Sequence, residues 1–303
     1  MGYTHQIIQE FEEGLNANHL ELSEVKAQVL GYGEISTVFQ IIGLDEVACK
    51  RIPLFNAKSE AEVYEKNYNS YCDHLKNAGL TLAKSHTEIF ALSHKPVTLY
   101  IVQEKLSVDQ FAHKLIHTLS NEDVKEVVQS IVREIKKIWD FNDKNGPGLE
   151  IALDGQLSNW VRQGNQYVYI DTSTPLFKID GKEQLDPELF LKTAPSFLRW
   201  IIRLLFLQDV MDRYYDLRSV LLDLAANLTK EQRQDLIPSV LEIINDHLGE
   251  NDNPIDEKEV EKYYKEDKLI WTLFLAFRRF DRWIQTKLFR RSYEYILPGK
   301  IKR

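Results

Sequence analysis

The feature that most constrains the fold of this chain is a run of three short apolar stretches between residues 25 and 52. Gly31 and Gly33 lie in the turn between the first two stretches, and the next turn begins at Gly43. Short apolar stretches bounded by glycine are typical of β-strands joined in hairpins. Because glycine lets backbone amides approach a ligand closely, the first hairpin is suited to fold over nucleotide phosphates. The third stretch carries Lys50, and a lysine in a mostly apolar strand needs an acidic or phosphate partner.

The rest of the first 105 residues predicts two helices and two more strands. We expect residues 5–16 to form an amphipathic helix, and residues 87–92 and 97–102 to form strands that complete a five-stranded sheet. A helix over residues 58–78 should face inward through Tyr64, Tyr68, Tyr71, Cys72 and Leu75.

Helical patterns dominate the remainder of the chain. Residues 120–142 predict a buried scaffold helix that begins at the cap Ser120 and ends before a Gly-Pro-Gly break. Further helical stretches are expected at about 187–226, 229–249 and 256–291. Aromatic side chains on helices usually pack in a core, which is what we expect for most of Trp200, Phe206, Tyr214, Tyr215, Tyr263, Tyr264, Trp271, Phe274, Phe277, Phe280 and Trp283.

The composition excludes several classes of protein. The 303 residues are 44% hydrophobic and 28% charged, and no apolar run reaches the roughly 18 residues that span a bilayer. The net charge of −8 argues against a general nucleic-acid-binding surface. Cys49 and Cys72 lack a metal-ligand spacing, and His113 and His117 lack a third ligand. We therefore expect a cytoplasmic globular protein without a transmembrane segment.

Three polar residues between positions 149 and 175 form the candidate site. Asp154 lies in a tight loop, Asn159 follows five positions later, and an apolar run over residues 167–170 reads as a strand that leads to Asp171. A phosphoryl-transfer site needs a carboxylate to orient the acceptor hydroxyl, and an amide oxygen and a second carboxylate to hold magnesium. The spacing predicts that all three side chains reach one mouth.

Four motifs in this order resemble those of the protein-kinase-like superfamily. Residues 31–38 (GYGEISTV) match a G-x-G-x-x-G-x-V loop with serine in the third glycine position, and residues 47–50 (VACK) match its V-A-I-K strand. Asp154 and Asn159 match the catalytic-loop pair, and Asp171 matches the metal-binding Asp of D-F-G. The resemblance covers roughly residues 24 to 220 and is nearest the aminoglycoside phosphotransferase and choline kinase-like branch.

The resemblance implies an α+β, bilobal kinase-like fold that binds ATP and Mg²⁺. Residues 1–105 would form the N-lobe with its small antiparallel sheet, and residues 106–303 the helical C-lobe. Asp154 would act as the base, and Asn159 and Asp171 would bind the metal. The nucleotide-binding residues implied are Gly31, Gly33, Ser36, Val38, Ala48, Lys50, Gln103, Glu104 and Lys105, of which the last three form the hinge that reads the adenine edge.

A glutamate on the helix over residues 58–78 would hold Lys50 in this family. Glu60, Glu62 and Glu65 are candidates, and we choose Glu65 because it lies beside the inward face of that helix. A solvated first turn stabilised by the helix dipole accounts for the other two.

The sequence departs from the family pattern at several positions. Ala152 replaces the usual histidine of the catalytic loop, and Gln156 stands where protein kinases place a lysine that neutralises the γ-phosphate. Residues 172–175 (TSTP) replace Phe-Gly, and no A-P-E segment follows. These departures weigh against protein kinase activity.

The resemblance therefore implies an ATP- and Mg-dependent phosphotransferase acting on a hydroxyl of a small-molecule acceptor, with some C-lobe aromatics lining the acceptor pocket. Transfer of AMP from a flipped nucleotide is a subclass that the same fold allows. A different class is a nucleotide-binding pseudokinase or scaffold that engages a protein through its helical C-terminal third.

The C-terminal end is basic in an acidic chain. A solvated helix face with a frayed tail is the simplest explanation, and an anionic substrate or a membrane surface is the alternative. The basic residues are Arg278, Arg279, Arg282, Lys287, Arg290, Arg291, Lys300, Lys302 and Arg303.

Overall fold

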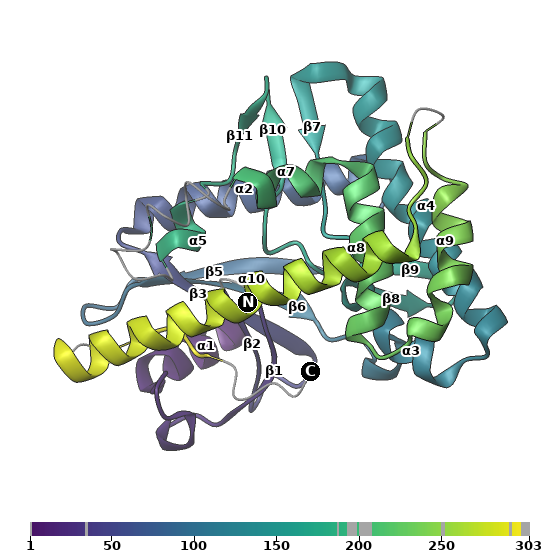
Figure 1. The fold of residues 1–303 in the computed structure, drawn as a ribbon. Helices are drawn as coiled ribbons and strands as arrows, with labels where there is room; N and C mark the ends of the chain where they lie inside the picture. Colours follow the sequence, from purple (N-terminus) through teal and green to yellow (C-terminus); the bar gives the residue numbers. More distant parts are fainter. Residues whose placement is uncertain are drawn as a thin grey trace.

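A five-stranded antiparallel sheet organises the N-terminal part of the molecule (Figure 1). The computed structural model describes residues 2–33, 36–186, 188–192, 199, 208–249, 252–290 and 293–297. All four pairs of neighbouring strands are antiparallel. The strands lie in the order β1 (Ala27–Tyr32), β2 (Thr37–Ile41), β3 (Val47–Phe55), β6 (Val97–Glu104) and β5 (Ser85–Phe90). The five-stranded sheet predicted from the sequence is thus confirmed.

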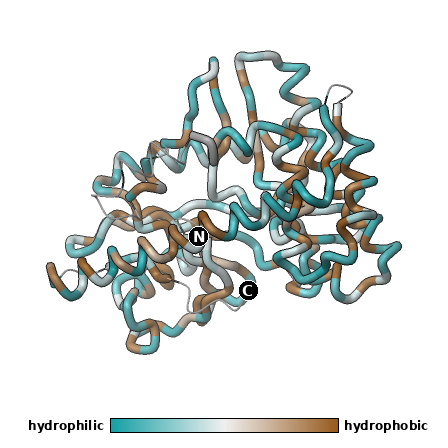
Figure 2. Tube along the Cα trace, in the orientation of Figure 1, coloured by the Kyte–Doolittle hydropathy of each residue, from teal (hydrophilic) through white to brown (hydrophobic). Residues whose placement is uncertain are grey.

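Two helices cover opposite faces of this sheet. Helix α1 (Gly2–Gly14) packs Ile8 and Phe11 against one face, and α2 (Lys58–Asn77) packs its apolar side against the other. Because side chains alternate along a strand, β3 and β6 each supply both cores. Apolar residues gather where the helices meet the sheet (Figure 2). The residues predicted to face inward on α2, Tyr64, Tyr68, Tyr71, Cys72 and Leu75, are all buried.

A buried charge cluster links both chain ends to β3. Arg51 is 1% exposed, and its Nε lies 2.6 Å from Glu12 Oε2 of α1. Its Nη2 also lies 3.0 Å from Glu294 Oε2, near the C-terminus. Burial raises the pKa of the Glu12 carboxyl, but Arg51, Tyr100 and Lys95 together outweigh burial and hold that pKa below its usual value. The cluster fastens α1 and residues 293–297 to the strand that carries Lys50.

The C-terminal part is mainly helical. Its described helices are α3 (Ala112–Thr118), α4 (Asn121–Asn145), α5 (Glu188–Lys192), α7 (Gln208–Tyr215), α8 (Leu217–Lys230), α9 (Ile237–Asn245), α10 (Glu257–Trp283) and a π-helical turn (Ile284–Leu288). The 3₁₀ turns of the described chain are Leu20–Leu22, Val108–Gln110, Gly146–Gly148, Leu157–Asn159 and Gln234–Leu236.

Helix boundaries agree with the sequence analysis at α4 and α10, but they differ between residues 187 and 249. Ser120 caps α4 as predicted, because its Oγ accepts a hydrogen bond from Asp123 N at 3.2 Å. The helix predicted over 187–226 is interrupted by Asp216, which caps α8 by accepting from Ser219 N at 2.8 Å. The stretch predicted over 229–249 contains α9, but its start is misplaced, because α8 continues to Lys230 and α9 begins at Ile237.

Two small sheets place the candidate site between the two parts. One has the order β4 (Thr81–Leu82), β9 (Gln166–Tyr169) and β8 (Trp160–Gln163), and includes the strand predicted over residues 167–170. The other has the order β11 (Lys182–Glu183), β10 (Phe177–Ile179) and β7 (Leu149–Ile151). The chain is therefore α+β, with most strands in its N-terminal part and most helices in its C-terminal part.

Helix α10 runs along the outside of the molecule from α8 to the N-terminal part (Figure 1). Near its start, Arg218 of α8 pairs with Glu259 at 2.6 Å. Near its end, Arg282 Nη2 donates to the carbonyl of Asn18 at 3.2 Å. Within the described ranges, no helix has the length and apolar character needed to cross a membrane.

Candidate functional site

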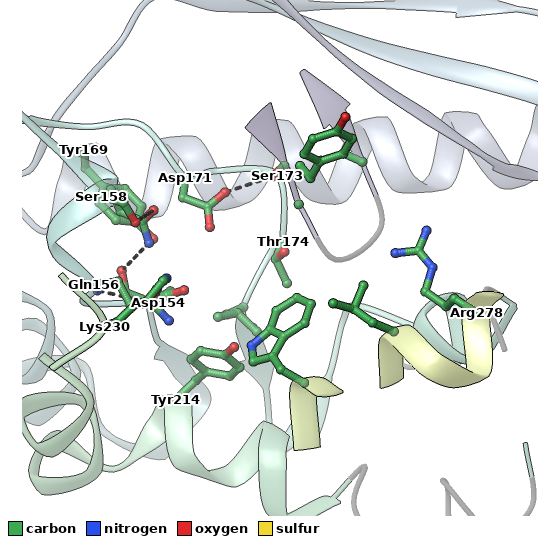
Figure 3. A pocket seen from close by; sticks show the side chains of 17 residues that line it. Asp154, Gln156, Ser158, Tyr169, Asp171, Ser173, Thr174, Tyr214, Lys230 and Arg278 are labelled. Atoms are coloured by element: carbon green, nitrogen blue, oxygen red, sulfur yellow. Dashed lines mark hydrogen bonds between the residues drawn. The ribbon is translucent and has the colours of Figure 1, made fainter. Parts of the chain in front are cut away.

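The three polar residues singled out in the sequence line one cavity of about 220 Å³ (Figure 3). Asp154, Asn159 and Asp171 are joined there by Gly33 and Ser36 from the turn between β1 and β2. Helices α7, α8 and α10 complete the wall. The site therefore lies where the N-terminal sheet, the 154–159 loop and the C-terminal helices meet.

Hydrogen bonds fix the shape of the loop around Asp154. Asp154 Oδ1 accepts from Gln156 N at 3.0 Å, and Asn159 Nδ2 donates to the Asp154 carbonyl at 3.2 Å. Asn159 Oδ1 accepts a hydrogen bond from Ser158 Oγ at 3.5 Å and has a second lone pair for a ligand. A Cβ added to Gly155 would lie 2.7 Å from Val220 Cγ1, so only glycine lets α8 approach the loop this closely.

Lys50 joins this group from β3. Its Nζ lies 3.6 Å from Asp171 Oδ1 and donates to the Ile170 carbonyl at 2.8 Å. Asp171 Oδ1 also accepts from Ser173 Oγ at 2.9 Å. Burial lowers the pKa of Lys50, and the Asp171 carboxylate opposes that shift by stabilising the charged ammonium. Lys50 therefore has the acidic partner that its apolar strand requires.

The structure shows other partners for Lys50 and Glu65 than the predicted pair between them. Glu65 Oε1 accepts from Thr87 Oγ1 at 2.5 Å, and Asp171 is the carboxylate paired with Lys50. The inward face of α2 instead presents tyrosine hydroxyl groups to the site. Tyr71 Oη donates to the Ala152 carbonyl at 2.7 Å.

Two further tyrosines of α2 hold the segment that follows Asp171. Tyr64 donates to the Ser173 carbonyl, and Tyr68 Oη accepts from Thr172 Oγ1 at 3.3 Å. Helix α2 therefore anchors residues 172–173 through neutral hydrogen bonds. These residues stand at the position of Phe-Gly in the protein-kinase motif D-F-G.

The hinge residues are also arranged differently from the expectation. Gln103 is buried, and its Nε2 donates to the Ile170 carbonyl at 3.1 Å. Glu104 N donates to the Lys84 carbonyl at 2.8 Å, and Lys105 N donates to the Glu46 carbonyl at 2.9 Å. These two backbone donors are already bonded within the chain. In this conformation they are therefore not available for the predicted hydrogen bonds to an adenine ring.

The glycine turn has a defined closure, although residues 34 and 35 lie outside the described residues. Gly33 N donates to the Ser36 carbonyl at 3.0 Å, and a Cβ on Gly33 would lie 2.6 Å from Ser36 Oγ. The pairing register shifts between Val29 and Gly31, which marks a bulge just before the turn.

The other predicted nucleotide-binding residues lie on the strands beside this turn. Val38 of β2 pairs with Lys50 of β3, and Ala48 of β3 pairs with Gln103 of β6. Val38 and Ala48 are half-buried.

The oxygen atoms at the site are hard ligands of the kind that magnesium prefers. Asp171 offers its carboxylate and Asn159 its amide oxygen, whose orientation is set by the bond from Nδ2 to Asp154. Among the described residues, no group of three or more His, Cys, Asp and Glu side chains could hold a metal. The donor set thus fits an ion that takes its remaining ligands from phosphate and water.

Lys230 is the main residue that the sequence analysis missed. It ends α8, lines the cavity and donates from Nζ to Gln156 Oε1 at 3.1 Å. The expectation that Gln156 leaves this part of the site without a cation is therefore wrong. No local pattern marks Lys230, because its approach depends on how α8 packs against the loop 74 positions earlier.

Helices α7 and α10 supply the outer wall of the cavity. Tyr214, Trp271, Leu275 and Arg278 line it (Figure 3). Tyr214 and Trp271 belong to the aromatics expected in part to form an acceptor pocket. Arg278 is only 4% exposed, so the solvated helix face expected for the basic residues does not hold for it.

Asp223 of α8 and Asp267 of α10 form an acidic pair near Lys230. Burial and the neighbouring Asp267 raise the pKa of Asp223 on α8 to about 6. Lys230 and hydrogen bonds from Tyr263 and Gln156 act in the opposite direction. Lys230 therefore lies near a carboxyl whose pKa is raised towards neutral pH.

His113, Cys49 and Cys72 do not line the cavity. Burial lowers the pKa of His113 to about 4, and Cys49 and Cys72 are buried free thiols. Trp200, Phe206, Arg291, Lys300, Lys302 and Arg303 lie outside the described residues.

A family model, described as a family of unknown function (DUF6206), matches residues 17–282. The chain belongs to this family. The matched DUF6206 region includes every residue that lines the cavity. No curated protein matches the chain.

Proposed function

We propose that this DUF6206 protein is an ATP- and Mg-dependent phosphotransferase with a bilobal, protein-kinase-like arrangement, and that its acceptor is a hydroxyl group of a small molecule. One observation carries the proposal. Asp154, Asn159 and Asp171 line one cavity with Gly33 and Ser36 of the glycine turn, and Lys50, far away in the sequence, pairs with Asp171 from β3. Positioning and electrostatic stabilisation are the main contributions that a protein makes to phosphoryl transfer.

Asp154 is the proposed base. It lines the cavity and is half-buried, and its Oδ1 is oriented by Gln156 N. A carboxylate held in this way can accept a hydrogen bond from an acceptor hydroxyl and take its proton during transfer. Asn159 stabilises the loop by bonding the Asp154 carbonyl.

Asp171, Asn159 and Lys50 form the proposed phosphate and metal side of the site. When bound, magnesium would neutralise phosphate charge and orient the phosphates. Asp171 and Asn159 are the oxygen ligands on the protein. Lys50, held 3.6 Å from Asp171, would contact the phosphates from the sheet side.

Lys230 is the proposed second cation. It reaches the cavity beside Gln156, the position that lacks the lysine of protein kinases. A cation in a partly buried site stabilises charge that builds up on a transferred phosphoryl group more strongly than one in water. Lys230 of α8 would thus supply the positive charge that the loop around Asp154 lacks.

Tyr214, Trp271 and Leu275 are the proposed acceptor-side surface. They lie on α7 and α10, across the cavity from the sheet. Flat aromatic faces suit ring-shaped acceptors, which they contact through apolar and stacking interactions.

A nucleotide-binding pseudokinase is the second candidate, and two observations favour it. Lys50 lacks the Glu65 partner, and the backbone donors of Glu104 and Lys105 are bonded within the chain. This candidate predicts ligand binding without turnover.

Turnover separates the two candidates. Purified protein is incubated with Mg-ATP and a panel of hydroxyl compounds, and ADP and pyrophosphate are quantified, because phosphoryl transfer releases ADP whereas transfer of AMP to the acceptor releases pyrophosphate. The phosphotransferase predicts acceptor-dependent ADP that is lost in Asp154→Asn. Nucleotide binding without release of ADP or pyrophosphate would favour the pseudokinase.

A further inference from the structure

The C-terminal half of α10 and the turn after it carry a row of apolar side chains on the molecular surface. The row, here called the α10 apolar row, consists of Leu269, Leu273, Phe280, Trp283, Leu288 and Phe289, which are 39–66% exposed. The first four follow the periodicity of a helix, so they lie along one face. Phe280 and Trp283 stack with ring centroids 6.2 Å apart.

Positive charge accompanies this row. Between residues 271 and 290 the sequence has five basic residues and a single acidic one, Asp281. Asp281 is only 7% exposed, whereas Arg279, Lys287 and Arg290 are exposed. The segment that carries most of the row is therefore cationic in a protein whose net charge is −8.

The N-terminal half of α10 has a different charge pattern, with lysines paired to glutamates. Lys262 lies 3.9 Å from Glu266, and Lys265 lies 2.6 Å from Glu261. These lysines are paired within their own helix, as expected for a solvated face. The excess of positive charge is thus confined to the part of α10 that carries the apolar row.

The row lies on a convex and peripheral element. Helix α10 runs along the outside of the molecule, and its C-terminal end reaches the edge of the view (Figure 1). Apolar segments mark that end of the helix in Figure 2. A convex rod can lie on a flat surface, whereas a protein partner would have to supply a matching groove.

We propose that this face of α10 docks onto an anionic lipid bilayer, with the helix axis parallel to the membrane plane. The apolar row would enter the boundary between headgroups and acyl chains, where tryptophan and phenylalanine are favoured. Arg279, Lys287 and Arg290 would contact anionic headgroups. A bilayer of this kind offers both an apolar layer and a negative surface, which is the combination that this face complements. The proposal is independent of the phosphotransferase proposal.

The test is co-sedimentation of the full chain with vesicles. Vesicles of phosphatidylcholine with about 30% phosphatidylserine are compared with vesicles of phosphatidylcholine alone. The proposal predicts binding to the anionic vesicles only, with release at about 0.5 M salt because exposed charges are then screened. No binding to anionic vesicles, or equal binding to both kinds, would overturn it.

Paired variants locate the contact. Phe280→Ser with Trp283→Ser, and separately Arg279→Gln with Lys287→Gln and Arg290→Gln, should each weaken binding more than about tenfold. The charge control, Lys262→Gln with Lys265→Gln and Lys268→Gln, changes the same helix. The apolar control, Leu22→Ser with Ile42→Ser, removes residues that are 66% and 64% exposed elsewhere. Both controls should bind like the wild type.

Circular dichroism and the melting temperature confirm that each variant is folded. Folded row or charge variants that bind as tightly as the wild type would contradict the proposal. Equal loss of binding in the control variants would contradict it as well, because binding would then not depend on this face.

Discussion

Lys230 Nζ lies 3.1 Å from Gln156 Oε1, in the cavity that Asp154 also lines. The loop therefore obtains its cation from the end of α8. This arrangement divides the proposed charge stabilisation between Lys50 on the sheet side and Lys230 on the helical side. The α8 residue Val220 reaches the loop at Gly155, where a Cβ would lie 2.7 Å from Val220 Cγ1.

Lys230→Met should lower kcat about 10- to 100-fold, because one charge that stabilises the transferred phosphoryl group is removed. Methionine keeps much of the apolar stem, so the melting temperature should change little. Steady-state ADP formation measures the effect, and Lys262→Met on the exposed face of α10 is the control. A kcat equal to that of wild type would remove Lys230 from the mechanism.

Asp223→Asn should make stability less dependent on pH. The pKa of Asp223 is about 6 in the folded protein, above its usual value of 3.8, so the folded state retains a proton that the unfolded state has lost. The contribution of this carboxyl to stability therefore falls as pH rises from about 4 to about 6, by no more than about 3 kcal/mol.

Urea unfolding at pH 4.5 and pH 7.5 measures this effect. Asp223→Asn should be more stable than wild type at the higher pH, and the two should converge at the lower pH. The exposed Asp45→Asn is the control and should follow the wild type. Parallel curves for wild type and Asp223→Asn would show that the carboxyl does not titrate in this range.

Glu12→Gln should destabilise the fold by roughly 3 kcal/mol at pH 7, because it leaves the buried Arg51 short of a charged partner. The pKa of Glu12 is lowered by Arg51, so its stabilising contribution is present above the usual value of 4.5 and is lost as pH falls through the folded pKa. Urea unfolding should therefore show a difference from wild type that shrinks in acid. Glu10→Gln, exposed on the same helix, should be close to neutral.

The sheet and the main polar site were predictable because their signals are local. Alternating apolar residues and glycine turns mark β1 to β3, and the apolar strand before Asp171 fixes where that side chain emerges. The apolar face of α2 was predictable for the same reason, since it follows from helical periodicity alone.

The errors arose where tertiary packing decides the outcome. Glu65 and Tyr68 are three positions apart on α2, and the rotation of the helix in the folded protein brings Tyr68 to Thr172 and Glu65 to Thr87. The end of α8 and the role of Lys230 depend on the capping residue Asp216 and on contacts across the chain. Helical periodicity alone did not place the break at residue 216, although an aspartate before a helix is a known start signal.

We propose that the cavity is a magnesium-nucleotide site in which Asp171 binds the metal and Asp154 is the base. Isothermal titration of Mg-ATP into wild type, Asp171→Asn and Asp154→Asn tests it most directly, with circular dichroism confirming the fold of each protein. The account predicts that Asp171→Asn weakens binding at least about tenfold, because a charged metal ligand is lost, and that Asp154→Asn binds like wild type but forms no ADP. Absence of Mg-ATP binding to the wild type, or equal binding by wild type and Asp171→Asn, would contradict it.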